Sequence, residues 1–267
     1  MKKPGFIAGA RYFLRGFSLI NTSGMRRYVA IPLTINIILF IGALWFGIDY
    51  INSWVSELQV SMSADSEEGV QWLNKLIEFV SWILIPLFVL TFMAVTFYSF
   101  TLLANLIAAP FNSLLAEKIE AHLGGATISS SGSIFDMLKD VGGSFLSELR
   151  KLLYFVTRAL PFVILFAIGL FFPPFGFIVT ILWFIFSAWM LAIEYSDYPM
   201  GNHAMYFPDQ RKTLKGNRMF ALGFGAATVA ATMIPFVNFF AMPVAVAAST
   251  AMWVDHWKDN IPQISVD

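Results

Sequence analysis

Four long stretches of this chain contain no charged residue, and this feature limits the possible folds more than any other. The stretches are 28–48, 79–116, 159–193 and 219–254. Each is at least as long as the roughly 20 apolar residues that a helix needs to cross the hydrocarbon core of a bilayer. A soluble domain of this size has no core large enough to bury four such runs. The chain is therefore predicted to be an all-α integral membrane protein.

Composition narrows the class of function. Charged residues make up only 13% of the chain, against about 25% in soluble domains. The 17 basic and 17 acidic residues balance, which predicts no nucleic-acid partner. The absence of cysteine excludes disulfides and thiolate ligands. His122, His203 and His256 are isolated in the sequence, and no nucleotide-binding or hydrolase motif is present. We therefore expect no metal, no cofactor and no enzymatic activity.

Breakers and charges divide the chain into segments of one membrane domain, 1–267. Residues 6–20 place two arginines among apolar neighbours on one helical face, which is typical of a helix in the membrane interface. Residues 49–78 are polar and acidic and are expected to form a loop. The long run that follows is expected to break near Pro110. The predicted segments are the interfacial helix 6–20, the spanning helices 28–48 and 79–106, the amphipathic helix 134–157, and the membrane hairpins 159–193 and 219–254.

The last two apolar runs are too long for one helix and too short for two full crossings with a loop. Each has breakers near its middle, at 172–176 in the first and at Pro235, Asn238 and Pro243 in the second. Each run therefore predicts a helical hairpin that enters the membrane partway and returns. Backbone that is not helical at that depth must be buried in protein or line a watery cavity. The glycines of 223–225 are expected to permit close helix packing.

Basic residues predict the orientation, because cytoplasmic loops of membrane proteins are enriched in Lys and Arg. The first 27 residues hold six bases and no acid, whereas the 49–78 loop holds a single base. The N-terminus, 117–158 and 194–218 are accordingly expected on the cytoplasmic side, with 49–78 outside.

The strongest local signal is the segment 22–27, Thr-Ser-Gly-Met-Arg-Arg, directly before the first long apolar run. A helix N-terminus offers unpaired N–H groups and a partial positive charge. Gly24 lets the backbone approach an anion closely, and Arg26 and Arg27 can hold an oxyanion through charge-assisted hydrogen bonds. The segment predicts an anion site, although an arginine pair at this place also fits a simple topology anchor.

The residues around this segment favour sulfate over phosphate. The first 48 residues contain no Asp, Glu or His, so a bound anion would meet mostly donors. Sulfate is fully ionised at neutral pH and needs only donors, whereas phosphate keeps an O–H that needs an acceptor. A buried polar group without its partner costs about 1–3 kcal/mol, or about 10- to 100-fold in preference.

Other polar side chains within the apolar runs are candidates for a permeation pathway. Asparagines in membrane helices also serve as contacts between helices, and Arg158 also fits an interfacial anchor. Two carboxylates at the ends of apolar runs, Glu117 and Glu194, are candidates for proton coupling, with structural pairing to nearby bases as the alternative. The pathway candidates are Asn36, Asn105, Asn112, Arg158 and Asn238.

Four separated segments resemble a known family in the right order. They are 23–27 (SGMRR), 107–120 (IAAPFNSLLAEKIE), 182–199 (LWFIFSAWMLAIEYSDYP) and 233–255 (MIPFVNFFAMPVAVAASTAMWVD). Together they make the chain similar to the CysZ family of bacterial sulfate permeases, and the resemblance covers nearly the whole length. It implies two long membrane helices with partly penetrating hairpins, and assembly into a homo-oligomer in the bilayer.

The resemblance also implies a function and a site. The family takes up sulfate across the bacterial inner membrane for cysteine biosynthesis, without an ATPase. Its sulfate site falls here on Gly24, Met25, Arg26 and Arg27, with Ser23 and Thr22 as additional candidates. Relatives often have Leu or Ile where this chain has Met25. Three alternatives stay open: transport of thiosulfate, selenate or molybdate; a membrane-shaping scaffold; and an enzyme that grips a lipid phosphate.

Overall fold

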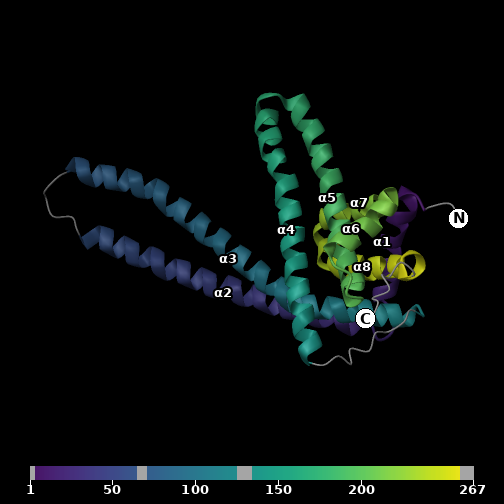
Figure 1. The fold of residues 1–267 in the computed structure, drawn as a ribbon. Coiled ribbons are helices and arrows are strands. Elements are labelled where there is room, and N and C mark those ends of the chain that lie inside the picture. Colours follow the sequence, from purple (N-terminus) through teal and green to yellow (C-terminus); the bar gives the residue numbers. More distant parts are fainter. Residues whose placement is uncertain (1–3, 65–70, 125–133, 259–267) are drawn as a thin grey trace. The chain divides into compact units, whose positions relative to one another are not determined.

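The computed structural model describes residues 4–64, 71–124 and 134–258, and within these ranges all regular structure is helical (Figure 1). Proteins in a bilayer satisfy their backbone N–H and C=O groups inside helices, because lipid offers no hydrogen-bond partners. The helices in chain order are α1 (Phe6–Ile20), α2 (Arg26–Ala64), α3 (Gln71–His122), α4 (Ile134–Phe171), α5 (Pro173–Asn202), α6 (Phe207–Gly216), α7 (Arg218–Thr232) and α8 (Pro235–His256).

Two prolines mark the helix breaks in the last apolar runs. Pro173 is at the first turn of α5, after the single non-helical residue Phe172, and Pro235 has the same position in α8. Proline is tolerated there because the first N–H groups of a helix have no intrahelical partner. The α4–α5 break therefore falls in the expected range 172–176, and the α7–α8 break falls at Pro235.

Three helices run further than the sequence pattern predicts. Residues 49–64 continue α2 where a loop was expected, because they contain neither Gly nor Pro. Pro110 lies inside α3 without ending it. The amphipathic stretch 134–157 and the apolar stretch from 159 form one helix, α4. A proline inside a helix removes one hydrogen bond, and long membrane helices tolerate that loss.

The chain forms two compact units, one of Met1–Val29 with Phe111–Asp267 and the other of Ala30–Pro110. In the second unit α2 and α3 run antiparallel (Figure 1). The rings of Tyr50 and Phe92 stack 5.4 Å apart. Large apolar side chains of α2, such as Trp45 and Phe46, are exposed. Such surface suits contact with lipid rather than water.

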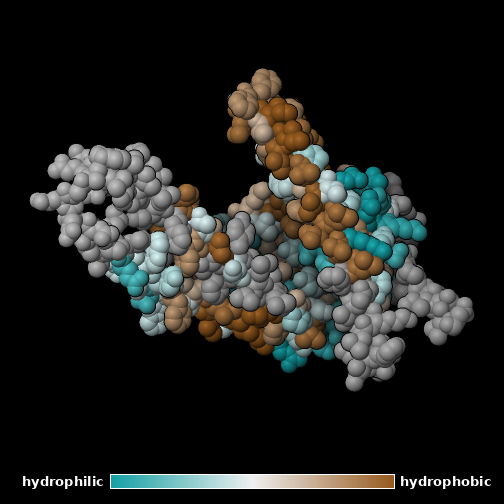
Figure 2. All heavy atoms as spheres, turned by 60° about the vertical axis from the view of Figure 1, so that its left-hand side comes forward, coloured by the Kyte–Doolittle hydropathy of each residue, from teal (hydrophilic) through white to brown (hydrophobic). Residues whose placement is uncertain are grey.

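In the first unit α8 is the central helix, and α1, α5 and α7 pack around it. Trp253 of α8 and Phe220 and Phe224 of α7 are fully buried. By contrast, α4 and the first half of α5 project as a hairpin whose tip, with Phe171 and Phe172, is exposed and hydrophobic (Figure 2). The core of this unit thus lies at the base of the hairpin.

Four described helical segments are long and apolar enough to cross a bilayer. Most of the α8 segment is buried inside the protein, whereas none of the α4 segment is. The protein is a multi-pass membrane protein. The segments are Arg26–Tyr50, Leu146–Phe171, Pro173–Asn202 and Pro235–His256.

Glycines let the helix backbones of the core touch. A β-carbon on Gly223 would lie 1.9 Å from the carbonyl oxygen of Phe6, and one on Gly225 would lie 1.8 Å from that of Ala188. Both distances are far below van der Waals contact. The close packing expected of residues 223–225 is confirmed, and it joins α7 to α1 on one side and to α5 on the other.

Gly225→Ala is therefore expected to destabilise the first unit, because α5 and α7 must separate to admit the methyl group. Overpacking of this kind costs about 1–3 kcal/mol. Gly47→Ala is the matched control, since no atom lies within 4 Å of its added β-carbon. Thermal unfolding in detergent, followed by tryptophan fluorescence, should show a lower midpoint for Gly225→Ala alone. Equal midpoints for the two variants would contradict the packing argument.

Candidate anion-binding site

The segment between α1 and α2 forms a tight turn with an open face. The Thr22 N–H donates to the Leu19 carbonyl at 3.1 Å, and the Met25 N–H donates to the Thr22 carbonyl, also at 3.1 Å. Gly24 has φ +89°, a left-handed conformation that favours glycine. No atom would lie within 4 Å of a β-carbon at Gly24. The backbone of the turn is therefore accessible to a ligand.

Buried side chains on either side of the arginines anchor the turn. Met25 and Val29 are buried in the core of the first unit, whereas Ser23, Arg26 and Arg27 are exposed. The Met25 N–H is already bonded within the turn, so Met25 contributes mainly by burying its side chain. A Leu or Ile at this place would serve the same purpose.

Both arginines keep donors available. The Nε of Arg26 donates to the Asn21 carbonyl at 3.0 Å, and an Nη of Arg27 donates to the Tyr28 hydroxyl at 3.1 Å. The Arg27 guanidinium also lies 4.9 Å from the centre of the Tyr28 ring. A guanidinium has five N–H donors. Neither side chain pairs with a carboxylate in the part of the chain that the structure describes, so their positive charges are not neutralised there.

The backbone N–H groups of the turn add to this set. No backbone hydrogen bond uses the N–H of Gly24, Arg26 or Arg27 in the described ranges, as expected at a helix N-terminus. The Thr22 hydroxyl, however, donates to the Leu19 carbonyl, so Ser23 is the hydroxyl that can still donate. The turn thus combines backbone donors, one hydroxyl and two guanidinium groups.

Three of the pathway candidates belong to the first unit, as the turn does. Asn112 is buried and its Nδ2 contacts the Met242 sulfur at 3.1 Å. Asn238 is exposed near the start of α8, and Arg158 is exposed on α4 with its guanidinium 5.4 Å from the Tyr154 ring centre. The described hydrogen bonds and ion pairs join none of these three to the turn.

Two further pathway candidates belong to the second unit. The Asn36 side chain on α2 is half-buried, and its Oδ1 is buried without a hydrogen-bond partner. Asn105 lies on α3, and its side chain is outside the described residues. A carbonyl oxygen without a donor is costly to bury. The unpartnered oxygen of Asn36 therefore makes it the better candidate of the two for a pathway within this unit.

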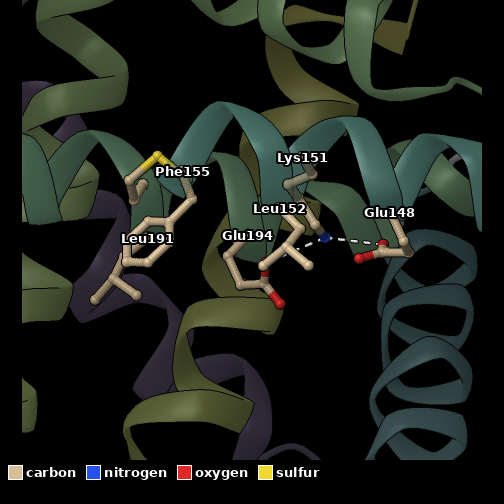
Figure 3. Close-up of a pocket in the computed structure, with 7 residues that line it drawn as sticks. Glu148, Lys151, Leu152, Phe155, Leu191 and Glu194 are labelled. Atoms are coloured by element: carbon tan, nitrogen blue, oxygen red, sulfur yellow. Dashed lines mark ion pairs between the residues drawn. The ribbon is translucent and has the colours of Figure 1, made fainter. Parts of the chain in front are cut away.

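The two carboxylates that the sequence singles out have different surroundings. Glu117 is half-exposed and pairs with Lys118 at 3.3 Å. Glu194 lies 3.1 Å from the Nζ of Lys151 in a pocket of about 310 Å³ between α4 and α5 (Figure 3). Structural pairing, the alternative reading of both residues, is present at each site.

Lys151 is surrounded by three carboxylates that come from two helices. Its Nζ lies 2.9 Å from Glu148, 3.1 Å from Glu194 and 2.8 Å from Asp197. Figure 3 shows the ammonium group between Glu148 and Glu194, with the apolar residues Leu152, Phe155 and Leu191 also lining the pocket. One cation facing three carboxylates leaves an excess of negative charge here. The sequence predicts only Glu194 as a candidate, because Lys151 and Asp197 are 46 positions apart and nothing local brings the Glu148–Lys151 pair to Glu194.

A buried pair that local spacing could not reveal lies at the base of the first unit. The His203 Nε2 contacts both Glu120 oxygens, at 2.8 and 2.9 Å, and the Trp253 indole N–H donates to the same carboxylate at 3.2 Å. All three side chains are buried. The His203 ring, isolated in sequence, thus connects the end of α5 to α3 and α8.

A third polar cluster fastens α1 to the end of α8. The Tyr12 hydroxyl donates to Asp255 at 2.7 Å, and Arg15 forms an ion pair with the same carboxylate. Burial, with a contribution from the Asp255 hydrogen bond, raises the pKa of Tyr12 to about 12. Tyr12 therefore stays neutral and able to donate well above physiological pH.

Glu120→Gln is expected to destabilise the protein, because the amide removes the negative charge and one acceptor that His203 and Trp253 share. The loss of a buried charged partner costs about 1–3 kcal/mol or more. Glu117→Gln is the matched control on the same helix, since exposed ion pairs contribute about 0–1 kcal/mol. Midpoints of thermal unfolding in detergent should fall clearly for Glu120→Gln only. A larger fall for Glu117→Gln would contradict this account.

Comparisons with known proteins show the family to which the chain belongs. A family model, EI24, described as sulfate transporter CysZ/etoposide-induced protein 2.4, matches residues 12–243. The protein named sulfate transporter CysZ from Vibrio cholerae serotype O1 is 43% identical over 254 residues, which cover 94% of each chain. The protein of the same name from Salmonella typhimurium is 42% identical over 252 residues, 94% of this chain and 93% of its own. Both relatives are named as transporters rather than enzymes. The chain belongs to the EI24 family, that of sulfate transporter CysZ and etoposide-induced protein 2.4.

Proposed function

We propose that the protein is a sulfate transporter that mediates sulfate uptake across the bacterial inner membrane and supplies cysteine biosynthesis without ATP hydrolysis. The observation that carries the proposal is the exposed α1–α2 turn, where Arg26 and Arg27 have no carboxylate partner among the described residues. The names of the relatives support sulfate as the ion.

Sulfate would bind at the turn through donors alone. The guanidinium groups of Arg26 and Arg27 supply charge-assisted hydrogen bonds, and the free N–H groups of Gly24 and the first helical residues add the helix N-terminus. Ser23 can donate a further hydrogen bond, whereas the Thr22 hydroxyl and the Met25 N–H are already engaged. Met25 holds the turn against the core.

The same donor set supports discrimination against phosphate. The O–H of a phosphate finds no carboxylate at the turn, and because the turn is exposed the missing acceptor costs less than the roughly 1–3 kcal/mol of a buried polar group. Thiosulfate, selenate and molybdate carry no such proton at neutral pH. The turn is therefore expected to reject phosphate more strongly than these anions, and flux measurements with each of them rank the selectivity.

The membrane arrangement that we propose has two long spanning helices, 28–48 and 79–106, and two hairpins that penetrate partway, 159–193 and 219–254. The stretch from Arg158 to Phe171 is about 20 Å long at 1.5 Å per residue, which is less than the roughly 30 Å of the hydrocarbon core. Most of the α8 segment is buried inside the protein, so its apolar surface is used in the core. Partial hairpins leave room for subunits to complete the pathway, which favours a homo-oligomer.

The membrane potential limits the possible modes of uptake. Moving two negative charges into an inside-negative cell costs about 4.6 kcal/mol per 100 mV. Uptake therefore requires either rapid consumption of cytoplasmic sulfate or a co-transported proton. Of the two candidate carboxylates, Glu194 is the better supported for proton coupling, because it competes with Glu148 and Asp197 for one ammonium group.

The double variant Arg26→Gln/Arg27→Gln is expected to lose most saturable sulfate flux, at least tenfold, because it removes the charged donors of the turn. The measurement is uptake of labelled sulfate into proteoliposomes at zero and at imposed voltage. Arg11→Gln, an exposed arginine of α1, is the matched control and should keep normal flux.

Phosphate at the same concentration as sulfate should leave the sulfate flux of the native protein unchanged. If the folded, inserted native protein gives no flux above empty vesicles, the protein is a scaffold rather than an autonomous transporter. If thiosulfate, selenate or molybdate inhibits the uptake of labelled sulfate more strongly than unlabelled sulfate does, the substrate is that oxyanion.

Glu194→Gln is expected to abolish stimulation of sulfate flux by an inward proton gradient, because a neutral amide cannot take up a proton. Glu117→Gln should keep the stimulation, since among the described residues Glu117 pairs with the neighbouring Lys118 alone. The measurement compares sulfate flux with and without the proton gradient at the same voltage. A native protein that does not respond to the gradient would identify a passive pore.

A further inference from the structure

Two arginines from different helices lie on one tyrosine ring in the first unit. The guanidinium carbon of Arg211, on α6, is 4.5 Å from the centre of the Tyr154 ring, and that of Arg158, on α4, is 5.4 Å away. The Tyr154 hydroxyl accepts a hydrogen bond from the Trp189 indole N–H at 3.2 Å, which fixes the ring between α4 and α5. The two permanent positive charges therefore lie within about 10 Å of each other, on the same aromatic ring.

These charges have no partner in the part of the chain that the structure describes. Neither guanidinium forms an ion pair there, and the Nε of Arg211 is buried without a hydrogen-bond acceptor. The nearby acidic side chains of α4 and α5 already form ion pairs with Lys151. They are Glu148, Glu194 and Asp197. Two cations on one ring and a buried donor without an acceptor fit a ligand that brings negative charge and several oxygens.

The position of the pair indicates where that ligand comes from. Helix α6, which packs against α4 and α5, is polar and exposes Lys212 and Lys215. Beyond Arg158, α4 exposes the apolar side chains Leu160, Val163 and Ile164, and continues for about 20 Å to its end. Arg158 is the last charged residue of α4, so it marks the end of the charged part of this helix, and Tyr and Trp side chains favour the interface level of a membrane.

We infer that Arg158 and Arg211 bind the phosphate of an anionic phospholipid whose acyl chain lies along the exposed apolar face of α4. Two guanidinium groups match the oxygens of a phosphodiester. The acyl chain distinguishes this ligand from a soluble oxyanion, because it also covers Leu160, Val163 and Ile164. This site is separate from the α1–α2 turn, and the inference does not depend on the proposed transport of sulfate.

Binding of phosphatidylglycerol to the delipidated full chain, compared with phosphatidylcholine, tests the inference. Native mass spectrometry in detergent counts the bound lipids and gives their relative affinities. The native protein should prefer phosphatidylglycerol, and Arg158→Gln/Arg211→Gln should weaken this binding roughly tenfold or more, as expected from the loss of charge-assisted hydrogen bonds. Arg158→Lys/Arg211→Lys should give an intermediate affinity, because lysine keeps the charge and loses the fork of donors.

The matched control is Arg150→Gln/Lys212→Gln, which removes two exposed cations from the same two helices. This control should bind phosphatidylglycerol as the native protein does. Equal loss in the control would overturn the inference, since overall charge would then explain the preference. Displacement of the lipid by millimolar sulfate would overturn it as well, because the site would then take soluble anions. Elution volume and helical content show that each variant is folded.

Discussion

Inside a bilayer no water replaces a broken backbone hydrogen bond, and this constraint sets the form of the whole chain. Apolar runs must be helical, so six prolines are carried inside helices: Pro32, Pro86, Pro110, Pro161, Pro199 and Pro243. The breaks of the hairpins occur where proline is the first helical residue and removes no bond, at Pro173 and Pro235. Lipid also provides little drive for helices to associate, so contact between backbones at Gly223 and Gly225 supplies the packing instead.

Charge is distributed unevenly over this helical frame. Among the described residues of the first unit, Glu120 contacts the His203 ring, Asp255 pairs with Arg15, and three acids share Lys151. The arginines of the α1–α2 turn have no such partner among the described residues. A carboxylate beside either arginine would compete with an incoming anion and cancel its attraction. The paired acids that the structure describes in the first unit are thus kept away from the turn, and this is the arrangement that the proposed sulfate transport requires.

The features that could be predicted from the sequence are those that depend on residues close together in the chain. The charge-free runs indicated the membrane helices, and the prolines at 173 and 235 indicated the hairpin breaks. Gly24, Arg26 and Arg27 could be proposed as a site because a turn followed by a helix N-terminus is a short, contiguous signal. The predicted break near Pro110 is wrong, since proline alone does not decide between a kink and a break. The continuation of α2 to Ala64 was also missed, because polarity was taken as evidence for a loop.

Contacts between distant residues left no such signal. His203 and Glu120 are separated by 83 positions, and Lys151 and Asp197 by 46. The pairing of Arg211 with Tyr154 likewise depends on how α6 packs on α4. Only the structure shows that the Thr22 hydroxyl and the Met25 N–H are used inside the turn. The sequence therefore predicts the position of an anion site, but it could not say which groups of the turn remain able to donate.

Exposure of the arginines has a consequence for conduction. A pathway must bind its ion strongly enough to select it and weakly enough to release it. Arg26 and Arg27 are exposed, so water and salt screen their attraction over about 8–10 Å at physiological ionic strength. Burying the same donors would tighten binding and slow release. An open turn with unpaired charges and an anchored Met25 thus favours selection with fast exchange, which suits a protein that moves its anion without hydrolysing ATP.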